Sequence, residues 1–291
     1  MNRFLWYNLQ MPELTVTSEI YEEYDYRTKK TPSKEGNVIS DFPFLLPQKN
    51  AIVQYDEDDD LDIERPQKEI IKIEHSSKTK IALVGLQVWR GAFLLGDWLI
   101  HIGLNGELNN KTVLELGAGT GFTSFVAALY AKKVVCTDID VGGILDLIRL
   151  NAKYNAKFIK SQFRVMPLDF MSAWSPTLSN EVKAADIVIA ADVIYDDDLT
   201  AAFVSTIQKI LNTSPPKTLY VVLEKRYVFT IEHMDSVAPC YETFLTLLDK
   251  VKTENIHSTW KVEQLPLDFP KYFTYDRVQE LVLWKITSQP N

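Results

Sequence analysis

The residues best suited to chemistry are four acids that stand at the ends of four successive short apolar segments. They are Glu115, Asp138, Asp169 and Asp192. A carboxylate at such a position accepts hydrogen bonds, and two of them can come from the diol of a ribose. Asp138 is suited to that diol, while Asp169 is suited to an adenine amino group with Phe170 beside the ring. The acids therefore predict a site for a nucleoside.

A glycine-rich turn lies directly after the first acid. Gly117, Gly119 and Gly121 separate an apolar segment from a helix-like segment. Glycines let the backbone turn tightly and approach a ligand, and the start of a helix offers free N–H groups. A dinucleotide fingerprint has its third glycine one residue later, where Phe122 stands. The spacing favours a nucleoside cofactor, although an ordinary strand-to-helix turn remains an alternative.

The elements that must position these residues alternate along the chain. Short apolar patterns predict strands around 111–116 and over 133–137, 163–168, 185–191 and 218–223. Helical spacing predicts helices over 88–102, 122–131, 144–151, 199–211 and 240–251. This alternation predicts an α/β fold, a parallel sheet with helices on both faces, in which the four acids meet at one edge. Two late strands, 260–264 and 280–286, lack a helix between them and predict an antiparallel pair at the C-terminal edge.

The first 68 residues differ from the rest in composition. We expect an N-terminal extension over 1–68, partly irregular and acidic, followed by one domain over 69–291. The acidic run 56–60 predicts a solvated loop, and Pro32, Pro43, Pro47 and Pro66 are expected to interrupt any long element. The weak alternation over 70–74 predicts a strand of an N-terminal β-ribbon.

Composition limits the possible functions. The 291 residues carry a formal net charge of −8, which disfavours direct binding of nucleic acid and favours a basic protein partner. Cys136 and Cys240 suggest neither a disulfide framework nor a zinc site, so we expect a nuclear or cytoplasmic protein. The four histidines form no pattern of metal ligands, and no run approaches the roughly 20 apolar residues of a membrane span. We expect a monomer that binds no metal.

Several motifs, in order, resemble those of a known family. Asp192-Val-Ile-Tyr195 resembles an Asp-x-x-Tyr motif after the fourth strand, and Gly85-Leu-Gln-Val-Trp89 resembles a Val-Trp segment before the glycine turn. With Glu-x-Gly-x-Gly-x-Gly between them, they resemble the family-16 protein methyltransferases over about 80–286. This family has a seven-stranded Rossmann-like sheet and acts mainly on lysine. Phe170 is a departure, since many relatives carry Trp there.

The resemblance implies a cofactor and a set of site residues. The cofactor would be S-adenosyl-L-methionine, which is released as S-adenosyl-L-homocysteine after the reaction. Asp192 and Tyr195 would be catalytic, at the mouth of a lysine channel, with Tyr227, Tyr272 and Phe273 as candidate channel walls. The residues that would bind the cofactor are Trp89, Glu115, Gly117, Gly119, Gly121, Asp138, Asp169, Phe170 and Ala191.

The substrate follows only from the resemblance. The stretches 191–200 and 222–226 are most similar to a nuclear member of the family, which implies a lysine of a nucleic-acid-binding protein. Three alternatives remain. An NAD-dependent oxidoreductase is disfavoured by Phe122, whereas a non-catalytic module for a basic partner is suggested by the acidic N-terminal segment. Methylation of another residue type or of a nucleic-acid base is disfavoured, because the Asn-Pro-Pro-Tyr pattern of many such enzymes is absent.

Overall fold

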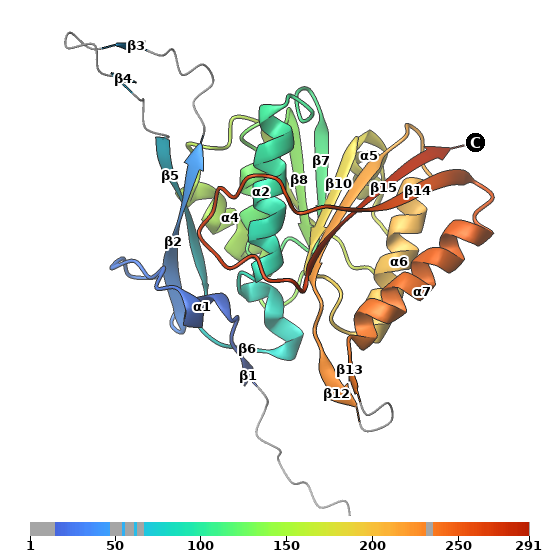
Figure 1. The fold of residues 1–291 in the computed structure, drawn as a ribbon, viewed down its shortest axis with the longest axis horizontal. Coiled ribbons are helices and arrows are strands. Elements are labelled where there is room, and N and C mark those ends of the chain that lie inside the picture. Colours follow the sequence, from blue (N-terminus) through green and yellow to red (C-terminus); the bar gives the residue numbers. More distant parts are fainter. Residues whose placement is uncertain (1–14, 47–53, 56–60, 63–66, 231–234, 291) are drawn as a thin grey trace, which may run out of the picture.

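A seven-stranded sheet forms the centre of the molecule (Figure 1). The computed structural model describes residues 15–46, 54–55, 61–62, 67–230 and 235–290. Across the sheet the strand order is β14, β15, β11, β10, β7, β8, β9. The strands are β7 (Thr112–Leu116), β8 (Lys133–Asp138), β9 (Gln162–Pro167), β10 (Ile187–Ala191), β11 (Thr218–Glu224), β14 (Ser258–Leu265) and β15 (Leu281–Pro290). The predicted α/β fold with a seven-stranded sheet is confirmed.

The strand directions divide the sheet into two parts. β9, β8, β7, β10 and β11 run parallel to one another. Buried side chains, mainly Val, Ile and Leu, cover both faces of β8, β7, β10 and β11. β14 and β15 are antiparallel to each other, as the sequence predicts. β15 also pairs antiparallel with β11, so the last strand of the chain lies between β11 and β14. The carboxyl ends of the parallel strands therefore share one edge.

In the part of the chain that the structure describes, six α-helices cover the two faces of the sheet. On one side lie α2 (Arg90–Leu104), α3 (Phe122–Ala127) and α4 (Ile144–Tyr154), and on the other lie α5 (Pro176–Ala184), α6 (Asp197–Leu211) and α7 (Pro239–Glu254). α3 is shorter than predicted and ends at Ala127. α5 was not predicted from the sequence, although Ser175 caps it by accepting a hydrogen bond from the Leu178 N–H at 3.1 Å.

The helical stretch from residue 81 to 104 is long and apolar enough to cross a membrane by length and composition, contrary to the expectation from the sequence. In the structure 67% of its most apolar window is buried within the protein. Asp97, in the middle of α2, is fully buried and accepts hydrogen bonds from the Tyr272 and Phe273 N–H groups and from Arg277. Such paired polar groups are typical of a core helix.

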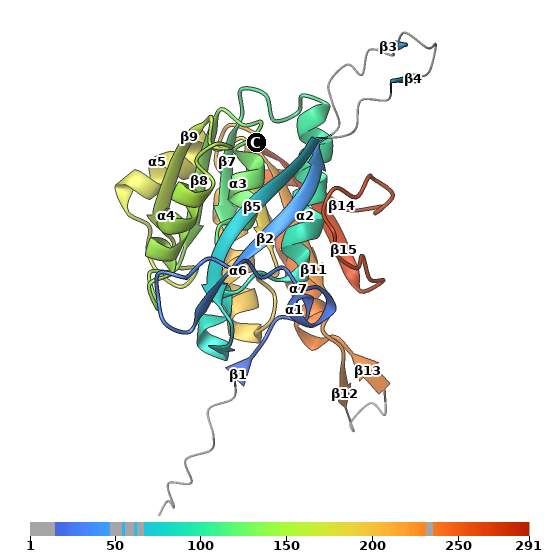
Figure 2. The same ribbon diagram turned by 90° about the vertical axis from the view of Figure 1, so that its left-hand side faces the viewer.

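A long two-stranded ribbon crosses the outer side of α2, α3 and α4 (Figure 2). It consists of β2 (Asn37–Leu46) and β5 (Gln67–Ser76), paired antiparallel along their whole length. The expected β-ribbon is present and is longer than 70–74. Pro43 lies inside β2, so the expectation that it interrupts the element is wrong. The N–H groups of Asp41 and Leu45 point away from β5, toward Tyr26 and Tyr272, and the missing N–H of Pro43 faces the same way.

Two asparagines join this ribbon to α4. The Asn151 side chain accepts from the Glu74 N–H at 2.8 Å and donates to the Glu74 carbonyl at 3.0 Å. Asn155, one helical turn later, makes the same pair of bonds with Lys72, at 2.9 Å and 2.6 Å. The two side-chain amides form the hydrogen bonds that a neighbouring strand would otherwise form with the edge of β5 that faces away from β2. Asn151 also donates to the Thr120 carbonyl in the glycine turn, at 3.1 Å.

Small elements gather at the carboxyl edge of the sheet, at the lower end of Figure 1. They are β1 (Thr15–Val16), α1 (Ile20–Glu23), β6 (Thr79–Lys80), the 3₁₀ helix η1 (Ile81–Leu86), and a hairpin of β12 (Val228–Thr230) and β13 (Asp235–Val237). Two further short strands, β3 (Gln54–Tyr55) and β4 (Leu61–Asp62), pair with each other. The acidic run 56–60 between them lies outside the described residues.

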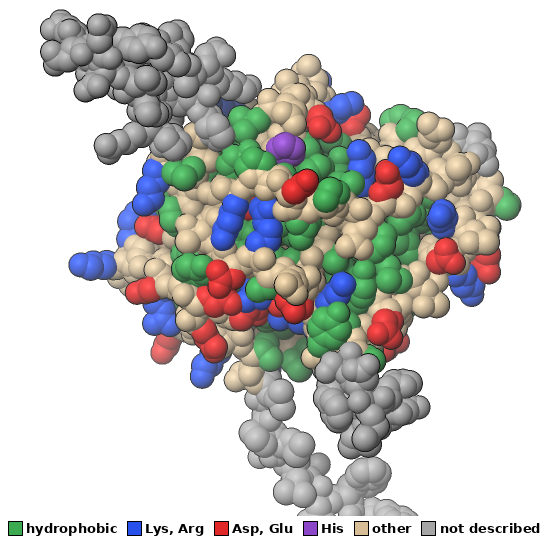
Figure 3. Space-filling model, in the orientation of Figure 1, with side chains coloured by type: hydrophobic (Ala, Val, Ile, Leu, Met, Phe, Trp, Pro, Cys, Tyr) green, Lys and Arg blue, Asp and Glu red, His purple; other side chains and the backbone are tan. Residues whose placement is uncertain are grey.

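On the face of the molecule shown in Figure 3, acidic and basic side chains are interspersed, with hydrophobic side chains between them. Basic side chains form no continuous patch among the residues described on this face.

Candidate active site

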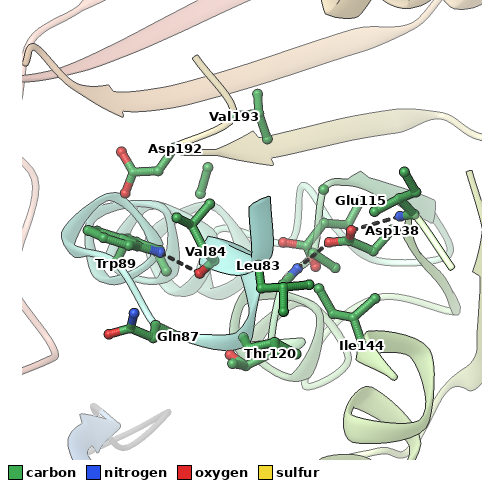
Figure 4. A pocket seen from close by; sticks show the side chains of 18 of the residues that line it. Leu83, Val84, Gln87, Trp89, Glu115, Thr120, Asp138, Ile144, Asp192 and Val193 are labelled. Carbon is green, nitrogen blue, oxygen red and sulfur yellow. Dashed lines mark hydrogen bonds between the residues drawn. The ribbon is translucent and has the colours of Figure 1, made fainter. Parts of the chain in front are cut away.

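A cavity of about 220 Å³ lies at the carboxyl ends of β7, β8 and β10. The glycine turn, the strand-end acids, and residues 82–89 from η1 and the stretch after it form its walls (Figure 4). The predicted site residues that line it are Trp89, Glu115, Gly117, Gly119, Asp138, Asp169, Phe170, Ala191, Asp192 and Tyr195. Gly121 does not line it, because it is the N-cap of α3 and packs toward Phe125 and Ile148.

At Gly119 the glycine turn comes close to Gly85, which belongs to the facing wall formed by residues 82–89. Its φ is +57°, and a Cβ there would lie 2.9 Å from the Gly85 carbonyl oxygen. Its N–H donates to Oδ2 of Asp138 at 2.7 Å. Only glycine fits this position, since any side chain would push residues 82–89 away from the turn.

Asp138, at the end of β8, has its carboxylate at the cavity. It is 8% exposed, and its Oδ1 accepts from the Ile139 N–H at 2.7 Å. Burial raises the pKa of Asp138 to about 6, although the two backbone hydrogen bonds oppose that shift. Each oxygen keeps a further lone pair for a ligand hydroxyl.

Glu115 is buried at the end of β7, behind the glycine turn. Its carboxyl group accepts hydrogen bonds from the Thr123 and Ser124 hydroxyl groups of α3. Burial raises the pKa of Glu115 to about 8, so the group is predominantly protonated at neutral pH. Glu115 thus joins β7 to α3 as a largely neutral acid while it lines the cavity.

The opposite end of the cavity is formed by the segment after β9. Asp169 accepts from the Met171 N–H at 2.9 Å and from the Ser172 hydroxyl at 2.6 Å, which closes a tight turn. Phe170 lines the cavity and packs against Phe203 of α6, with ring centroids 5.5 Å apart. An aromatic ring therefore stands beside the strand-end carboxylate.

Asp192 joins three segments at the mouth of the cavity. Its backbone is left-handed, with a φ of +52°. Its carboxylate accepts from the Gly91 N–H at 2.7 Å and from the Glu224 N–H at 3.0 Å, linking the ends of β10 and β11 to the start of α2. A Cβ at Gly91 would lie 2.5 Å from that carboxylate. Burial raises the pKa of Asp192.

Tyr195 stands three residues further on, with 43% of its surface exposed. Its ring lines the cavity and is also open to solvent. The helix that follows is capped by Asp196, whose Oδ1 accepts from the Leu199 N–H at 2.9 Å.

Three candidate channel walls lie elsewhere. Tyr272 and Phe273 are buried beside Asp97 in the helix layer, because their N–H groups donate to its carboxylate. The interpretation of these two as channel walls is wrong. Tyr227 is 52% exposed and is not among the residues that line the cavity.

Sequence reasoning missed much of the wall that faces the glycine turn. Leu83, Val84 and Gln87 line the cavity, and the Trp89 indole N–H donates to the Val84 carbonyl at 2.9 Å (Figure 4). These residues precede any regular pattern, and only the Val-Trp resemblance indicated the region.

The chain matches a family model described as lysine methyltransferase over residues 66–239. It belongs to that family. Members of this family use S-adenosyl-L-methionine as methyl donor. The residues present fit that cofactor, since a glycine cradle that a Cβ would fill faces a buried strand-end carboxylate.

The chain is similar to curated relatives of this family. It is 34% identical to methyltransferase-like protein 22 of Mus musculus over 260 residues, which are 82% of this chain and 65% of the relative. It is 34% identical to the Homo sapiens protein of that name over 239 residues, covering 76% of this chain and 58% of the relative. A protein N-lysine methyltransferase of Xenopus tropicalis is 30% identical over 150 residues, covering 52% of this chain and 64% of the relative. The chain spans about three fifths of the length of these relatives.

Proposed function

We propose that this protein is an S-adenosyl-L-methionine-dependent protein-lysine N-methyltransferase. The observation that carries the proposal is the cavity, in a member of the lysine methyltransferase family, where the glycine turn and the strand-end acids meet. When bound, the cofactor supplies an electrophilic methyl group and is released as S-adenosyl-L-homocysteine.

The residues of the cavity have distinct roles in this proposal. Asp138 accepts from the ribose hydroxyls, Asp169 and Phe170 hold the adenine, and the backbone of Gly117 and Gly119 surrounds the methionine portion with Glu115 behind it. Trp89 and Ala191 complete the wall. The site needs no metal, because each of these contacts uses only hydrogen bonds or ring packing.

Asp192 and Tyr195 act on the incoming lysine. The lysine amine must be neutral to attack, and its ordinary pKa is about 10.4. Loss of water around the amine, once the bound substrate covers the Tyr195 ring, lowers the pKa of the lysine, whereas the Asp192 carboxylate raises it. Asp192 therefore orients the amine with the lone pairs that its two backbone bonds leave free. Most of the rate enhancement comes from holding the reactants in line.

The partner in this proposal is a nucleic-acid-binding protein of the nucleus or cytoplasm, and the enzyme acts as a monomer. The resemblance over 191–200 and 222–226 and the net charge of −8 support a basic protein partner.

The test supplies the purified protein with radiolabelled S-adenosyl-L-methionine and separate nuclear and cytosolic lysates. We expect label on protein, recovered as methyl-lysine after hydrolysis and mass spectrometry, and none with the Asp138→Ala variant. Label confined to RNA, to small molecules or to another residue type would contradict the proposal. Binding of a basic protein without turnover would indicate the non-catalytic module instead.

A further inference from the structure

The N-terminal segment, residues 16–23, contacts the outer side of the cavity wall formed by residues 82–89. The Gln87 side chain, 2% exposed, accepts from the Ser18 N–H at 2.9 Å and donates to the Val16 carbonyl at 3.0 Å. The next residue, Val88, donates its N–H to the Tyr21 hydroxyl at 3.1 Å. These partners lie 67 to 71 residues earlier in the sequence, so the wall depends on a distant part of the chain.

Tyr21 is itself fixed in place by the ribbon. Its ring stacks on His75 of β5, with centroids 4.4 Å apart and planes 6° from parallel. His75 is 1% exposed, and its two ring nitrogens contact the Ser40 hydroxyl and the Ser76 carbonyl. The stacking on His75 therefore holds the Tyr21 side chain, whose hydroxyl accepts the hydrogen bond from the Val88 N–H.

Two ion-paired arginines connect the same segment to the mouth of the cavity. Arg90 contacts Glu23, Glu224 at the end of β11 at 2.7 Å and, more weakly, Glu19 at 4.0 Å. Arg226 contacts both carboxylate oxygens of Glu19, at 3.3 Å and 3.4 Å. These pairs join α1 to the chain that leads into the β12–β13 hairpin.

Arg226 also lies over the indole ring of Trp89, with its guanidinium carbon 5.2 Å from the ring centroid. Trp89 lines the cavity and its N–H is held by Val84. A guanidinium over an indole is a favourable cation–π contact. Glu19 therefore holds the Arg226 guanidinium in place, and that guanidinium in turn packs on the Trp89 ring that lines the cavity.

We propose that Glu19 and Arg226 are positioning residues for the cofactor site, and that they act through the Trp89 ring. The pair holds Trp89 in the orientation that lines the cavity. Residues 16–23 then contribute to the geometry of the cofactor site, in addition to packing on the domain. The inference rests on the family's cofactor and is independent of which side chain is methylated.

The pair is partly exposed to solvent. The Arg226 and Glu19 side chains are 43% and 25% exposed, and ion pairs near a protein surface generally add little to the stability of the fold. Its loss should therefore change cofactor binding more than it changes stability. The Lys261–Glu263 pair on β14, at 2.8 Å and more exposed, provides a matched control far from the cavity in the sheet.

The experiment is a double-mutant cycle read by the affinity for S-adenosylhomocysteine. Glu19→Gln, Arg226→Gln and the double variant are titrated by calorimetry, and their thermal unfolding without ligand is compared with that of Lys261→Gln. We expect each single variant to raise the Kd about threefold to tenfold and the double variant to raise it by clearly less than the product of the two single effects. Unfolding midpoints should shift no further than in the control.

A charge-preserving variant separates the charge of Arg226 from its planar shape. Arg226→Lys keeps a cation but loses the guanidinium that contacts both Glu19 oxygens and stacks on Trp89, so its Kd should lie between those of the parent and of Arg226→Gln. Additive effects in the cycle, or a Kd unchanged in both single variants, would each overturn the proposal. The binding assay needs no protein substrate, so a wrong assignment of the methylated residue would not affect it.

Discussion

At the scale of the residue, Asp138 is the group whose charge state matters most for the proposed ligand. Its carboxylate lies at the end of β8, accepts two backbone N–H groups, and has a pKa raised to about 6 by burial. A protonated acid accepts ribose hydroxyls less well than a carboxylate does. Cofactor affinity should therefore follow the ionisation of this group.

The Kd for S-adenosylhomocysteine should fall about tenfold between pH 5 and pH 7 and level off above, because about a tenth of Asp138 is ionised one unit below its pKa. Calorimetry at unit steps of pH measures this. In Asp138→Asn the affinity should be weak and flat over the same range. A parent Kd that does not change with pH would exclude Asp138 as the acceptor.

Glu115 should give the fold a pH dependence of its own. Its folded pKa, about 8, lies above the ordinary value of 4.5, so its contribution to stability is complete below about pH 4.5 and is lost as the pH rises through 8. Glu115→Gln resembles the neutral acid and cannot ionise. Between pH 5 and pH 8 the unfolding free energy of the parent should fall relative to this variant by on the order of 2–4 kcal/mol.

Urea unfolding of both proteins at several pH values provides the measurement. Asp138 titrates in both proteins, so its effect on the unfolding free energy largely cancels when the two pH profiles are subtracted. If the two proteins show parallel pH profiles, Glu115 is already ionised in the fold and its hydroxyl partners stabilise the charged form.

The position of most site residues was predictable at this scale, because strand ends in a parallel sheet share an edge. What those side chains contact was not predictable. Nothing in the sequence shows that the Asp192 carboxylate holds Gly91 and Glu224, or that Asp97 draws Tyr272 and Phe273 into the core. These contacts join segments 32 to 176 residues apart and depend on the completed fold.

At the scale of the element, α4 is the connection between the ribbon and the sheet. Asn151 satisfies the N–H and carbonyl of Glu74 and the carbonyl of Thr120 in a fully buried position. Buried polar groups without a partner cost about 1–3 kcal/mol each. The helix thus supports both β5 and the glycine turn.

Asn151→Ala should lower the unfolding free energy by about 2–4 kcal/mol, since it leaves three buried backbone groups without this partner. Chemical denaturation measures the change, and Lys153→Ala at an exposed position of the same helix is the control. A loss below about 0.5 kcal/mol would mean that the ribbon does not depend on this side chain.

Periodicity predicted the elements that carry a strong pattern and missed those that do not. The five parallel strands and five helices follow from apolar runs and helical spacing. α5 has few apolar residues, and only Ser175 followed by Pro176 marks its start. Strand order is set by pairing across the sheet, so the place of β15 between β11 and β14 was not predictable from local pattern.

At the scale of the whole molecule, the N-terminal residues and the domain share one core. Phe42 and Phe44 of β2 pack on Phe93, Phe122 and Phe273, and β5 spans the expected boundary at residue 68. The boundary between extension and domain stays a prediction. The apolar stretch 41–46 indicated packing on the domain, and the structure confirms it. Which aromatic rings it contacts was not predictable, because those rings lie far away in the sequence.

The interior place of β15 has a consequence for biosynthesis. The edge of β11 has no neighbour on that side until residues 281–290 have left the ribosome, and β14 has no strand to pair with before then. An unpaired strand edge invites pairing with other chains. The nascent protein therefore exposes the unpaired edge of β11 until β15 has been synthesised, and that edge can pair with other chains in the interval.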